Sequence, residues 1–266
     1  MHNQYFSLSV VFCTVAHFPP IQSAGTSPDF DYSWQPQVPP LLNRVSDLIQ
    51  SESPSLVLAK FGDQFFLLIT GLESPTKKDF AGRVIRHSIA WITEANDDGE
   101  RLARAISSQY LQGALSINEI DRLIQLGGKN GFDFNSSKFK EFSLSILNDT
   151  EIENSSLESS VDDSKTKSKM AENLQALREE LAFDLQNFRL PKNYEVFVVV
   201  TGMKSEDSLT KERIWRSLSN LVKSRNWKPS SNTKKGDSSP KKLMLALSLI
   251  LLILIIGVVI FLIFLK

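Results

Sequence analysis

One segment of the chain combines charged, titratable and conformationally free residues just before a predicted strand. Its candidates for binding a ligand or a partner are Asp79, Gly82, Arg83, Arg86 and His87. Guanidinium groups bind carboxylates and phosphates through paired hydrogen bonds, imidazole titrates near neutral pH, and glycine lets another group approach the backbone closely. We expect this segment, together with Thr70 and Gly71 earlier in the chain, to form a binding surface. The alternative is a strand edge with a purely structural Asp79–Arg83 pair.

A second polar segment, from Thr201 to Ser208, joins an apolar strand to a predicted helix. Its candidate residues are Thr201, Gly202, Lys204 and Ser205. Backbone N–H groups at the start of a helix attract anions, so a nucleotide- or anion-binding loop is one interpretation. Two acidic residues follow directly, however, and the chain contains no G-x-x-x-x-G-K-[ST] or G-x-G-x-x-G motif. A serine that caps the helix explains the segment more simply.

No catalytic residue, metal site or cofactor is expected from the sequence. A Ser/His/Asp hydrolase that uses Ser74 or Ser88 with His87 lacks the G-x-S-x-G elbow. Cys13 is the single cysteine, and the chain has only three histidines. These counts exclude an internal disulfide framework and a cysteine-ligated zinc or iron–sulfur site.

Two stretches of the chain resemble each other. Phe66–Ser74 and Phe197–Ser205 share Phe, Thr, Gly and Ser at identical spacing, with aliphatic residues between. Each reads as an apolar strand that ends in Thr-Gly and a polar turn. Either two strands end in similar loops by chance, or the two strands are equivalent and their ends lie side by side.

The segment 243–265 is apolar throughout except for a serine and a glycine. As a helix it would extend about 34 Å, which is enough to cross a bilayer. Lysines precede it at Lys234, Lys235, Lys241 and Lys242, and the positive-inside bias then places the N-terminal domain in the cytoplasm. The alternative, a signal peptide at 5–18 with an outside ectodomain, lacks a basic start and shows the period-two alternation of a strand.

The elements that position these residues are read from hydrophobic periodicity and from turn residues. The predicted strands cover 5–17, 55–61, 64–70, 84–92 and 194–201. The predicted helices cover 40–50, 98–112, 117–126, 137–147, 169–188 and 207–224. This pattern is typical of a layered, mixed α/β domain. Because a helix–strand–helix unit cannot bury its own strand, we expect strand 194–201 to join the N-terminal sheet.

The predicted organisation is a domain over 1–225, a basic tether over 226–242 and a transmembrane helix over 243–265. Within the domain, an acidic linker over 149–168 is expected to be disordered. The formal net charge of zero comes from 30 basic and 30 acidic residues and argues against a nucleic-acid binder. The charge is unevenly placed, since the linker is acidic and the stretch from Lys204 to Lys242 is basic.

The sequence therefore predicts a tail-anchored, single-pass membrane protein whose cytoplasmic α/β domain binds, senses or adapts to a partner. The expected partners are the lipid bilayer, a protein and, as a further option, a second copy of the chain. Two alternatives stay open. One is a nucleotide or anion sensor, or an enzyme, that uses the 79–88 and 201–208 loops. The other is an effector that perturbs the membrane when its domain is triggered.

Overall fold

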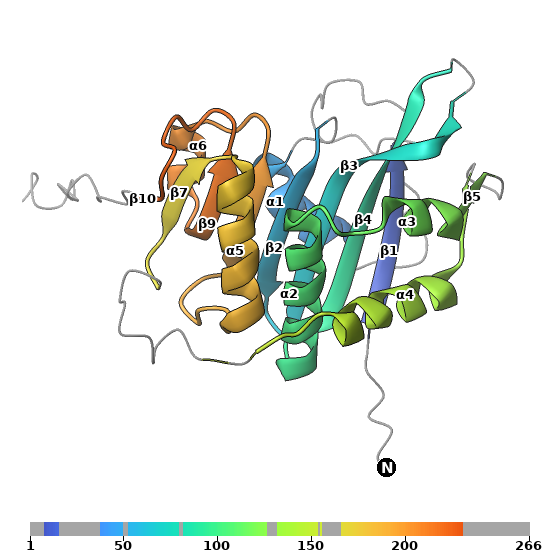
Figure 1. Cartoon of the computed structure of the whole chain (residues 1–266), viewed down its shortest axis with the longest axis horizontal. Helices are drawn as coiled ribbons and strands as arrows, with labels where there is room; N and C mark the ends of the chain where they lie inside the picture. The colour runs from blue at the N-terminus through green and yellow to red at the C-terminus, as the bar shows by residue number, and fades with distance from the viewer. Residues whose placement is uncertain are drawn as a thin grey trace, which may run out of the picture. The chain divides into compact units, whose positions relative to one another are not determined.

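A mixed β-sheet of eight strands runs through the described part of the chain, and helices cover both of its faces (Figure 1). The computed structural model describes residues 8–15, 38–49, 53–79, 82–126, 132–153, 155 and 166–230. Across the sheet the strands follow the order β1-β4-β3-β2-β8-β9-β7-β10. The mixed α/β class predicted from the sequence is therefore confirmed.

The strands of the sheet are β1 (Leu8–Val15), β2 (Ser55–Phe61), β3 (Gln64–Lys78), β4 (Val84–Glu94), β7 (Lys169–Glu172), β8 (Val196–Thr201), β9 (Ile214–Ser219) and β10 (Lys228–Pro229). A separate two-stranded ribbon pairs β5 (Ile124–Leu126) with β6 (Phe132–Phe134). The N-terminal half of the sheet is antiparallel, whereas β8, β9 and β7 run parallel to one another.

The predicted strands 55–61 and 64–70 pair as a hairpin of β2 and β3, with Gly62-Asp63 as its two-residue turn. Gly62 has a φ of +64°, a conformation that costs glycine little and that tight hairpin turns require. The register pairs Ser55 with Thr70 at the far end. Almost all residues of β2 are buried, as expected for a central strand that is covered on both faces.

Strand β8 joins this N-terminal sheet, as the sequence predicted. It pairs antiparallel with β2, with Leu56 opposite Val200, and parallel with β9. Four of its six residues are valines, which favour strands because their branched side chains pack well on a pleated surface. The N-terminal and C-terminal parts of the chain therefore share one sheet.

The helices form a layer on each face of the sheet. On one face lie α2 (Asp97–Leu111), α3 (Ile117–Leu123), α4 (Ser136–Asp149) and α5 (Gln175–Asn187), with α2 beside α5 (Figure 1). On the opposite face lie α1 (Val38–Val45), the short 3₁₀ helix Ser46–Leu48 and α6 (Glu206–Lys211). Asn96 caps α2, since its Oδ1 accepts a hydrogen bond from Gly99 N at 2.8 Å.

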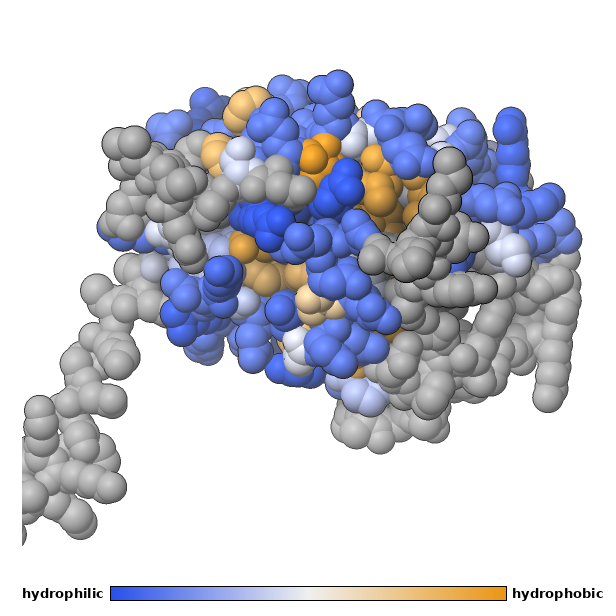
Figure 2. Space-filling model, turned by 90° about the horizontal axis from the view of Figure 1, so that it is seen from below, coloured by the Kyte–Doolittle hydropathy of each residue, from blue (hydrophilic) through white to orange (hydrophobic). Residues whose placement is uncertain are grey.

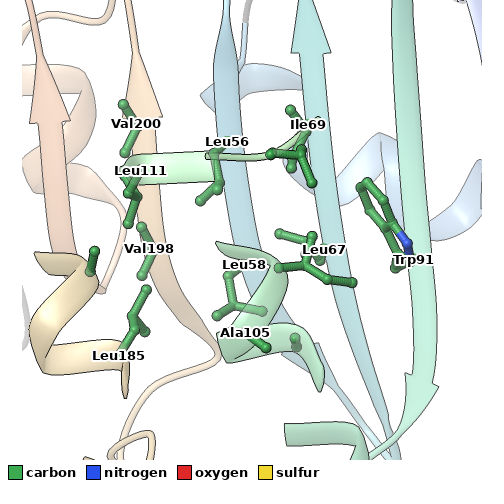
Figure 3. Packing of buried hydrophobic residues seen from close by; sticks show 14 of the residues in the cluster. Leu56, Leu58, Leu67, Ile69, Trp91, Ala105, Leu111, Leu185, Val198 and Val200 are labelled. Atoms are coloured by element: carbon green, nitrogen blue, oxygen red, sulfur yellow. The ribbon is translucent and has the colours of Figure 1, made fainter. Parts of the chain in front are cut away.

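The larger core lies between the sheet and the α2–α5 layer. Figure 3 shows side chains of β2, β3 and β8 packed against α2 and α5; the labelled residues are Leu56, Leu58, Leu67, Ile69, Trp91, Ala105, Leu111, Leu185, Val198 and Val200. Full burial of one such aliphatic side chain stabilises a fold by about 2 kcal/mol. Seen from below, the described surface is mainly hydrophilic, and apolar residues show only between the polar ones (Figure 2).

A buried arginine ties α2 to the end of α5. The Nε of Arg104 donates to the carbonyl of Leu185 at 2.7 Å, and its Nη2 donates to the carbonyls of Gln186 and Glu153. The last carbonyls of a helix have no hydrogen-bond donor within the helix. The Arg104 guanidinium supplies that donor at the end of α5. Burial lowers the pKa of Arg104 to about 10, against the opposing effect of Glu100.

Three predicted helices are wrong in part. Residues 169–172 form β7 rather than the start of a helix, because Met170 and Ala171 are buried against β9 and the opposite layer. The predicted helix 207–224 ends at Lys211 and is followed by β9, whose six residues are all buried. The apolar residues from Ile214 onward fit both the helical period of about 3.6 residues and the strand period of two. Pairing with β8 makes this segment a strand. Residues 124–126, predicted as helix, form β5.

The acidic segment begins in contact with the domain. Glu153 N donates to the carbonyl of Gln186 at 2.8 Å, and Arg189 N donates to the carbonyl of Ser155 at 2.9 Å. Of the predicted linker 149–168, the structure describes 149–153, 155 and 166–168, and the other positions lie outside the described residues. The predicted membrane segment 243–265 lies outside the described residues, and among the described helices none is long and apolar enough to cross a membrane.

Candidate functional site

Strands β3 and β4 continue past the rest of the sheet as a long hairpin, which projects at the upper right of Figure 1. The register shifts between Ile69 and Leu72, around Gly71, and pairing then resumes with Leu72 opposite His87. We call residues 73–79 and 82–87 the hairpin arm. It contains all five candidates that the sequence placed between Asp79 and His87.

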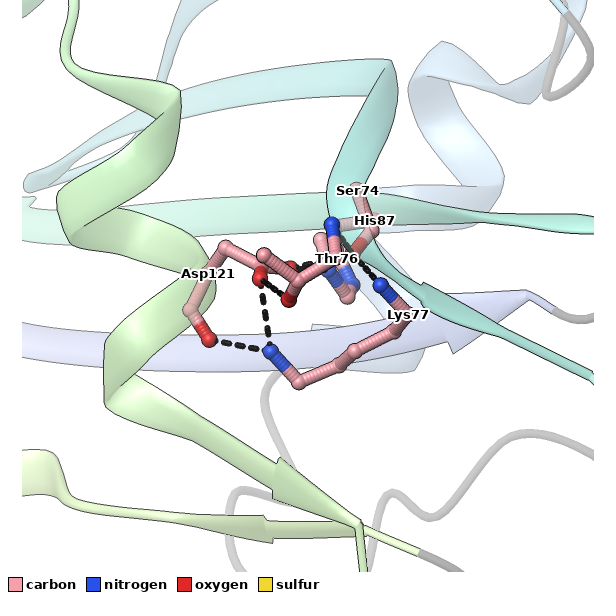
Figure 4. Close-up of polar contacts among 5 residues, drawn as sticks. All are labelled: Ser74, Thr76, Lys77, His87 and Asp121. Atoms are coloured by element: carbon pink, nitrogen blue, oxygen red, sulfur yellow. Dashed lines mark hydrogen bonds and ion pairs between the residues drawn. The ribbon is translucent and has the colours of Figure 1, made fainter.

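A buried carboxylate on α3 holds the base of this arm. Asp121 accepts hydrogen bonds from Ser74 at 2.5 Å and from Thr76, and its Oδ2 lies 2.8 Å from Lys77 Nζ. Its Oδ1 also lies 3.0 Å from His87 Nε2. Figure 4 shows the four arm side chains converging on this single carboxylate. We call these five residues the Asp121 cluster.

The cluster sets the charge state of its two titratable members in a defined way. Burial alone would raise the pKa of Asp121, but hydrogen bonds from Lys77, Ser74, Thr76 and His87 outweigh it and hold the pKa well below its usual range. Burial lowers the pKa of His87, and the hydrogen bond to Asp121 opposes this only in part. The carboxylate is therefore charged and the imidazole neutral near pH 7.

The arrangement is not that of a catalytic triad, although it joins a serine, a histidine and an aspartate. In a triad the imidazole lies between the hydroxyl and the carboxylate, so that it can take the proton of the nucleophile. Here Ser74 donates directly to Asp121, and its Oγ also accepts from the backbone N of Lys77 at 2.8 Å. The cluster fixes the arm against α3.

Asp121 was not among the residues singled out in the sequence. The signal lay in its place on α3, since it follows the inward-facing Ile120 and both are buried. A carboxylate on the buried side of an amphipathic helix requires a partner. The sequence could have raised this requirement, but Ser74, Thr76 and Lys77 could be identified as the partners only from the strand register.

The charged residues further out on the arm form ion pairs within the hairpin. Arg83 Nε lies 2.6 Å from Asp79 Oδ2, and Arg83 N donates to Asp79 Oδ1 at 2.9 Å. Gly82, at φ +79°, closes this turn. Arg86 Nη2 lies 2.8 Å from Glu73 Oε1. The structural Asp79–Arg83 pair predicted as an alternative is therefore present, yet the two arginine side chains remain 44% and 42% exposed.

The candidates from Thr201 to Ser205 follow β8, which lies on the other side of β2 from the strands of the hairpin arm. Thr70-Gly71 ends the sheet portion of β3, and Thr201-Gly202 ends β8. Both strands run antiparallel to β2, so they run parallel to each other and reach the same edge of the sheet. The two resembling stretches are thus equivalent in direction, but β2 separates them. The alternative in which the two strand ends lie side by side is therefore wrong, because β2 lies between them.

Ser53, just before β2, is enclosed by both Thr-Gly pairs. A Cβ added to Gly71 would lie 2.5 Å from the Ser53 carbonyl carbon, and one on Gly202 would lie 3.0 Å from the Ser53 Oγ. Thr70 Oγ1 donates to the Ser53 carbonyl at 3.5 Å. These glycines therefore provide space for the chain that enters β2, rather than for a ligand.

A row of buried hydroxyl groups crosses four strands at this edge. It consists of Thr70, Ser55, Thr201 and Ser219, which neighbour one another on β3, β2, β8 and β9. Successive side chains of a strand point to opposite faces of the sheet. The chain neighbours of these four residues belong to the core beneath the α2–α5 layer, so the hydroxyl groups face the other side of the sheet; these neighbours are Ile69, Leu56, Val200 and Leu218. Among the described residues, Thr201 Oγ1 has no hydrogen-bond partner.

The Thr201–Ser208 segment is explained by helix capping. Ser205 Oγ accepts from Ser208 N at 3.2 Å at the start of α6, and Glu206 and Asp207 occupy the first turn. Lys204 contributes its carbonyl, which accepts from Ser219 Oγ at 2.6 Å. The helix has only six residues, and two carboxylates at its start repel anions. The capping interpretation from the sequence is therefore confirmed.

No group of three or more potential metal ligands occurs among the residues that the structure describes. The four membrane-proximal lysines of the sequence analysis lie outside those residues. Comparisons with protein-family models, with curated proteins and with solved structures found no match for this chain.

Proposed function

We propose that this protein is a membrane-tethered module whose α/β domain binds a protein partner through the hairpin arm. The Asp121 cluster carries this proposal, because it holds the projecting arm rigidly against α3. A surface that is fixed before binding loses less conformational entropy when a partner docks. The arm then presents Arg83 and Arg86, each close to a carboxylate and each more than two-fifths exposed.

The chemistry of the arm favours an acidic, extended partner segment. Guanidinium groups exchange one carboxylate for another at little cost when both partners are partly solvated. Val84, the first residue of β4, lies between Arg83 and Arg86 in the chain and is exposed. An apolar contact flanked by two guanidinium groups fits a peptide that alternates acidic and apolar residues.

The tether is proposed from the sequence pattern at 243–265 and from the lysines that precede it. Positive charge on the domain side of an apolar span favours retention of the domain in the cytoplasm. In this view the domain does not act freely in solution, since the span confines it to one membrane and raises its local concentration there. The span then localises the partner that the arm binds.

Site-specific photocrosslinking tests the binding surface. A photoreactive amino acid at Val84, introduced into the full chain in its own cells, is expected to give a discrete covalent adduct. The adduct should be lost when Arg83→Ala and Arg86→Ala are combined. The same probe at Phe183, which is exposed on α5, is the matched control. Equal adducts at both positions, or none at Val84, would contradict the proposal.

A further inference from the structure

The loops that follow β8 and β9 carry exposed apolar side chains at neighbouring positions. Thr201 pairs with Ser219 as the last residues of two parallel strands. Two residues beyond each lie Met203, which is 61% exposed, and Leu221, which is 52% exposed. Among the described residues, only Val84 and Phe183 are large apolar residues exposed to a comparable degree. We call residues 202–204 and 220–223 the loop pair.

The backbone of the loop pair is fixed from below by Ser219. Its Oγ donates to the carbonyl of Lys204 at 2.6 Å and accepts from Leu221 N at 3.2 Å. Val222 N donates to the Ser219 carbonyl at 3.2 Å, and its side chain is fully buried. One hydroxyl therefore links the two loops. Met203 and Leu221 are exposed on a connected backbone rather than on separate mobile loops.

Basic residues surround this apolar pair. Lys204 is half-buried, and Lys223 and Arg225 are exposed. The acidic residues nearby are Glu172, whose backbone N donates to the Ser224 carbonyl at 2.8 Å, Glu206, which lies 2.5 Å from Lys228 Nζ, and Asp207 at the start of α6. The cations of the neighbourhood outnumber its acids. An apolar pair with a basic rim complements the interfacial region of an anionic bilayer, where each nearby lysine or arginine contributes about 1 kcal/mol.

We propose that the loop pair docks on an anionic lipid surface, with Met203 and Leu221 entering the headgroup region. This inference rests on the proposed membrane tether and adds to it an orientation of the domain. The described residues end at Ser230, and the segment 231–242 separates them from the apolar segment. A chain of that length extends to about 40 Å at most, which keeps the loop pair within reach of the bilayer.

The test uses the full chain reconstituted into vesicles of phosphatidylcholine with and without phosphatidylserine. Cys13→Ser removes the single cysteine, and Met203→Cys or Leu221→Cys then carries an environment-sensitive nitrobenzoxadiazole label. Labels at both positions are expected to shift to shorter emission wavelengths and to be quenched by headgroup spin-labelled lipid when phosphatidylserine is present. Phe183→Cys, at an exposed position of α5, is the matched control and should show neither change.

A second set of variants tests the role of charge. Combining Lys204→Glu with Lys223→Glu is expected to abolish the quenching at Met203→Cys, without changing the thermal unfolding midpoint. If the labels at 203 and 221 are quenched no more than the control in membrane-integrated protein, the docking surface is overturned while the tether stands. Emission shifts that depend on protein density but not on spin-labelled lipid would identify a second copy as the occupant and also overturn it. Extraction of the chain by alkaline carbonate would instead overturn the tether.

Discussion

Asp121 of α3 and His87 of β4 lie 3.0 Å apart, Oδ1 to Nε2, and both side chains are almost completely buried. This contact joins the helical layer to the hairpin arm. It also places a charged carboxylate beside a neutral imidazole, with Lys77 supplying the compensating positive charge. Four side chains of the arm therefore share a single ionised carboxylate on α3.

Replacing that carboxylate should destabilise the domain strongly. Asp121→Asn leaves the Lys77 ammonium group, which is only 13% exposed, without its counter-ion. Breaking a buried pair in this way typically costs about 3 kcal/mol or more. The free energy of unfolding, measured by urea denaturation of the full chain in detergent, should fall by that amount. Glu119→Gln on the exposed side of the same helix should change it by less than about 0.5 kcal/mol; equal effects would contradict the structural role of Asp121.

Stability should fall in two stages as the pH is lowered. Because the pKa of His87 is lowered in the folded state, the unfolded chain binds a proton first. Stability therefore decreases as the pH falls through about 6.5, by up to about 1.4 kcal/mol per pH unit. The lowered pKa of Asp121 preserves its contribution until the pH falls below about 4.

The His87→Gln variant separates these two stages. It should remove the decrease in the thermal unfolding midpoint between about pH 7 and pH 5, because glutamine does not titrate. The decrease below about pH 4 should remain, since Asp121 is still present. A variant that retains the full decrease above pH 5 would show that another group is responsible for it.

The glycines at the sheet edge predict a contrast between two substitutions. Gly71 and Gly82 both have positive φ, of +70° and +79°. A Cβ at Gly71 would lie 2.5 Å from the Ser53 backbone, whereas one at Gly82 meets no atom of the described residues within 4 Å. Gly82→Ala should cost about 1 kcal/mol for the backbone conformation alone. Gly71→Ala should cost clearly more, and equal losses in urea denaturation would contradict the close approach.

Arg104 offers a test of the link between α2 and α5. Arg104→Lys keeps the positive charge but cannot donate to three carbonyls in the fixed geometry of a guanidinium group. Hydrogen exchange should become faster at the end of α5 and at 151–155, and the free energy of unfolding should fall by about 2 kcal/mol. Arg101→Lys, one turn earlier and paired with Asp98 at 3.8 Å, is the control and should leave both nearly unchanged. Unchanged exchange in Arg104→Lys would contradict the link.

Much of the fold could be predicted from the sequence because local patterns agreed with tertiary packing. The hairpin around Gly62 and the helix after Asn96 carry strong turn and cap signals, and both are present. The segments around Met170 and Ile214 were wrongly predicted as helices. Their apolar residues fit both periods, and only pairing with β8 and β9, distant in the sequence, favours strands.

The candidate site was predicted in part. The sequence identified the residues of the hairpin arm and the Asp79–Arg83 pair, because these groups lie close together in the chain. It did not identify Asp121, whose contacts with His87 and Ser74 span 34 and 47 residues. Contacts of that kind depend on the register between β3 and β4 and on the position of α3, which local periodicity does not determine.

The claim that residues 243–265 hold the domain at a membrane underlies both proposals. Alkaline carbonate extraction of membranes tests it most directly, with the full chain compared to the same chain ended at Lys242. The account predicts that the full chain stays in the membrane pellet and that the shortened chain appears in the supernatant. Release of the full chain by carbonate, or retention of the shortened chain in the pellet, would contradict it.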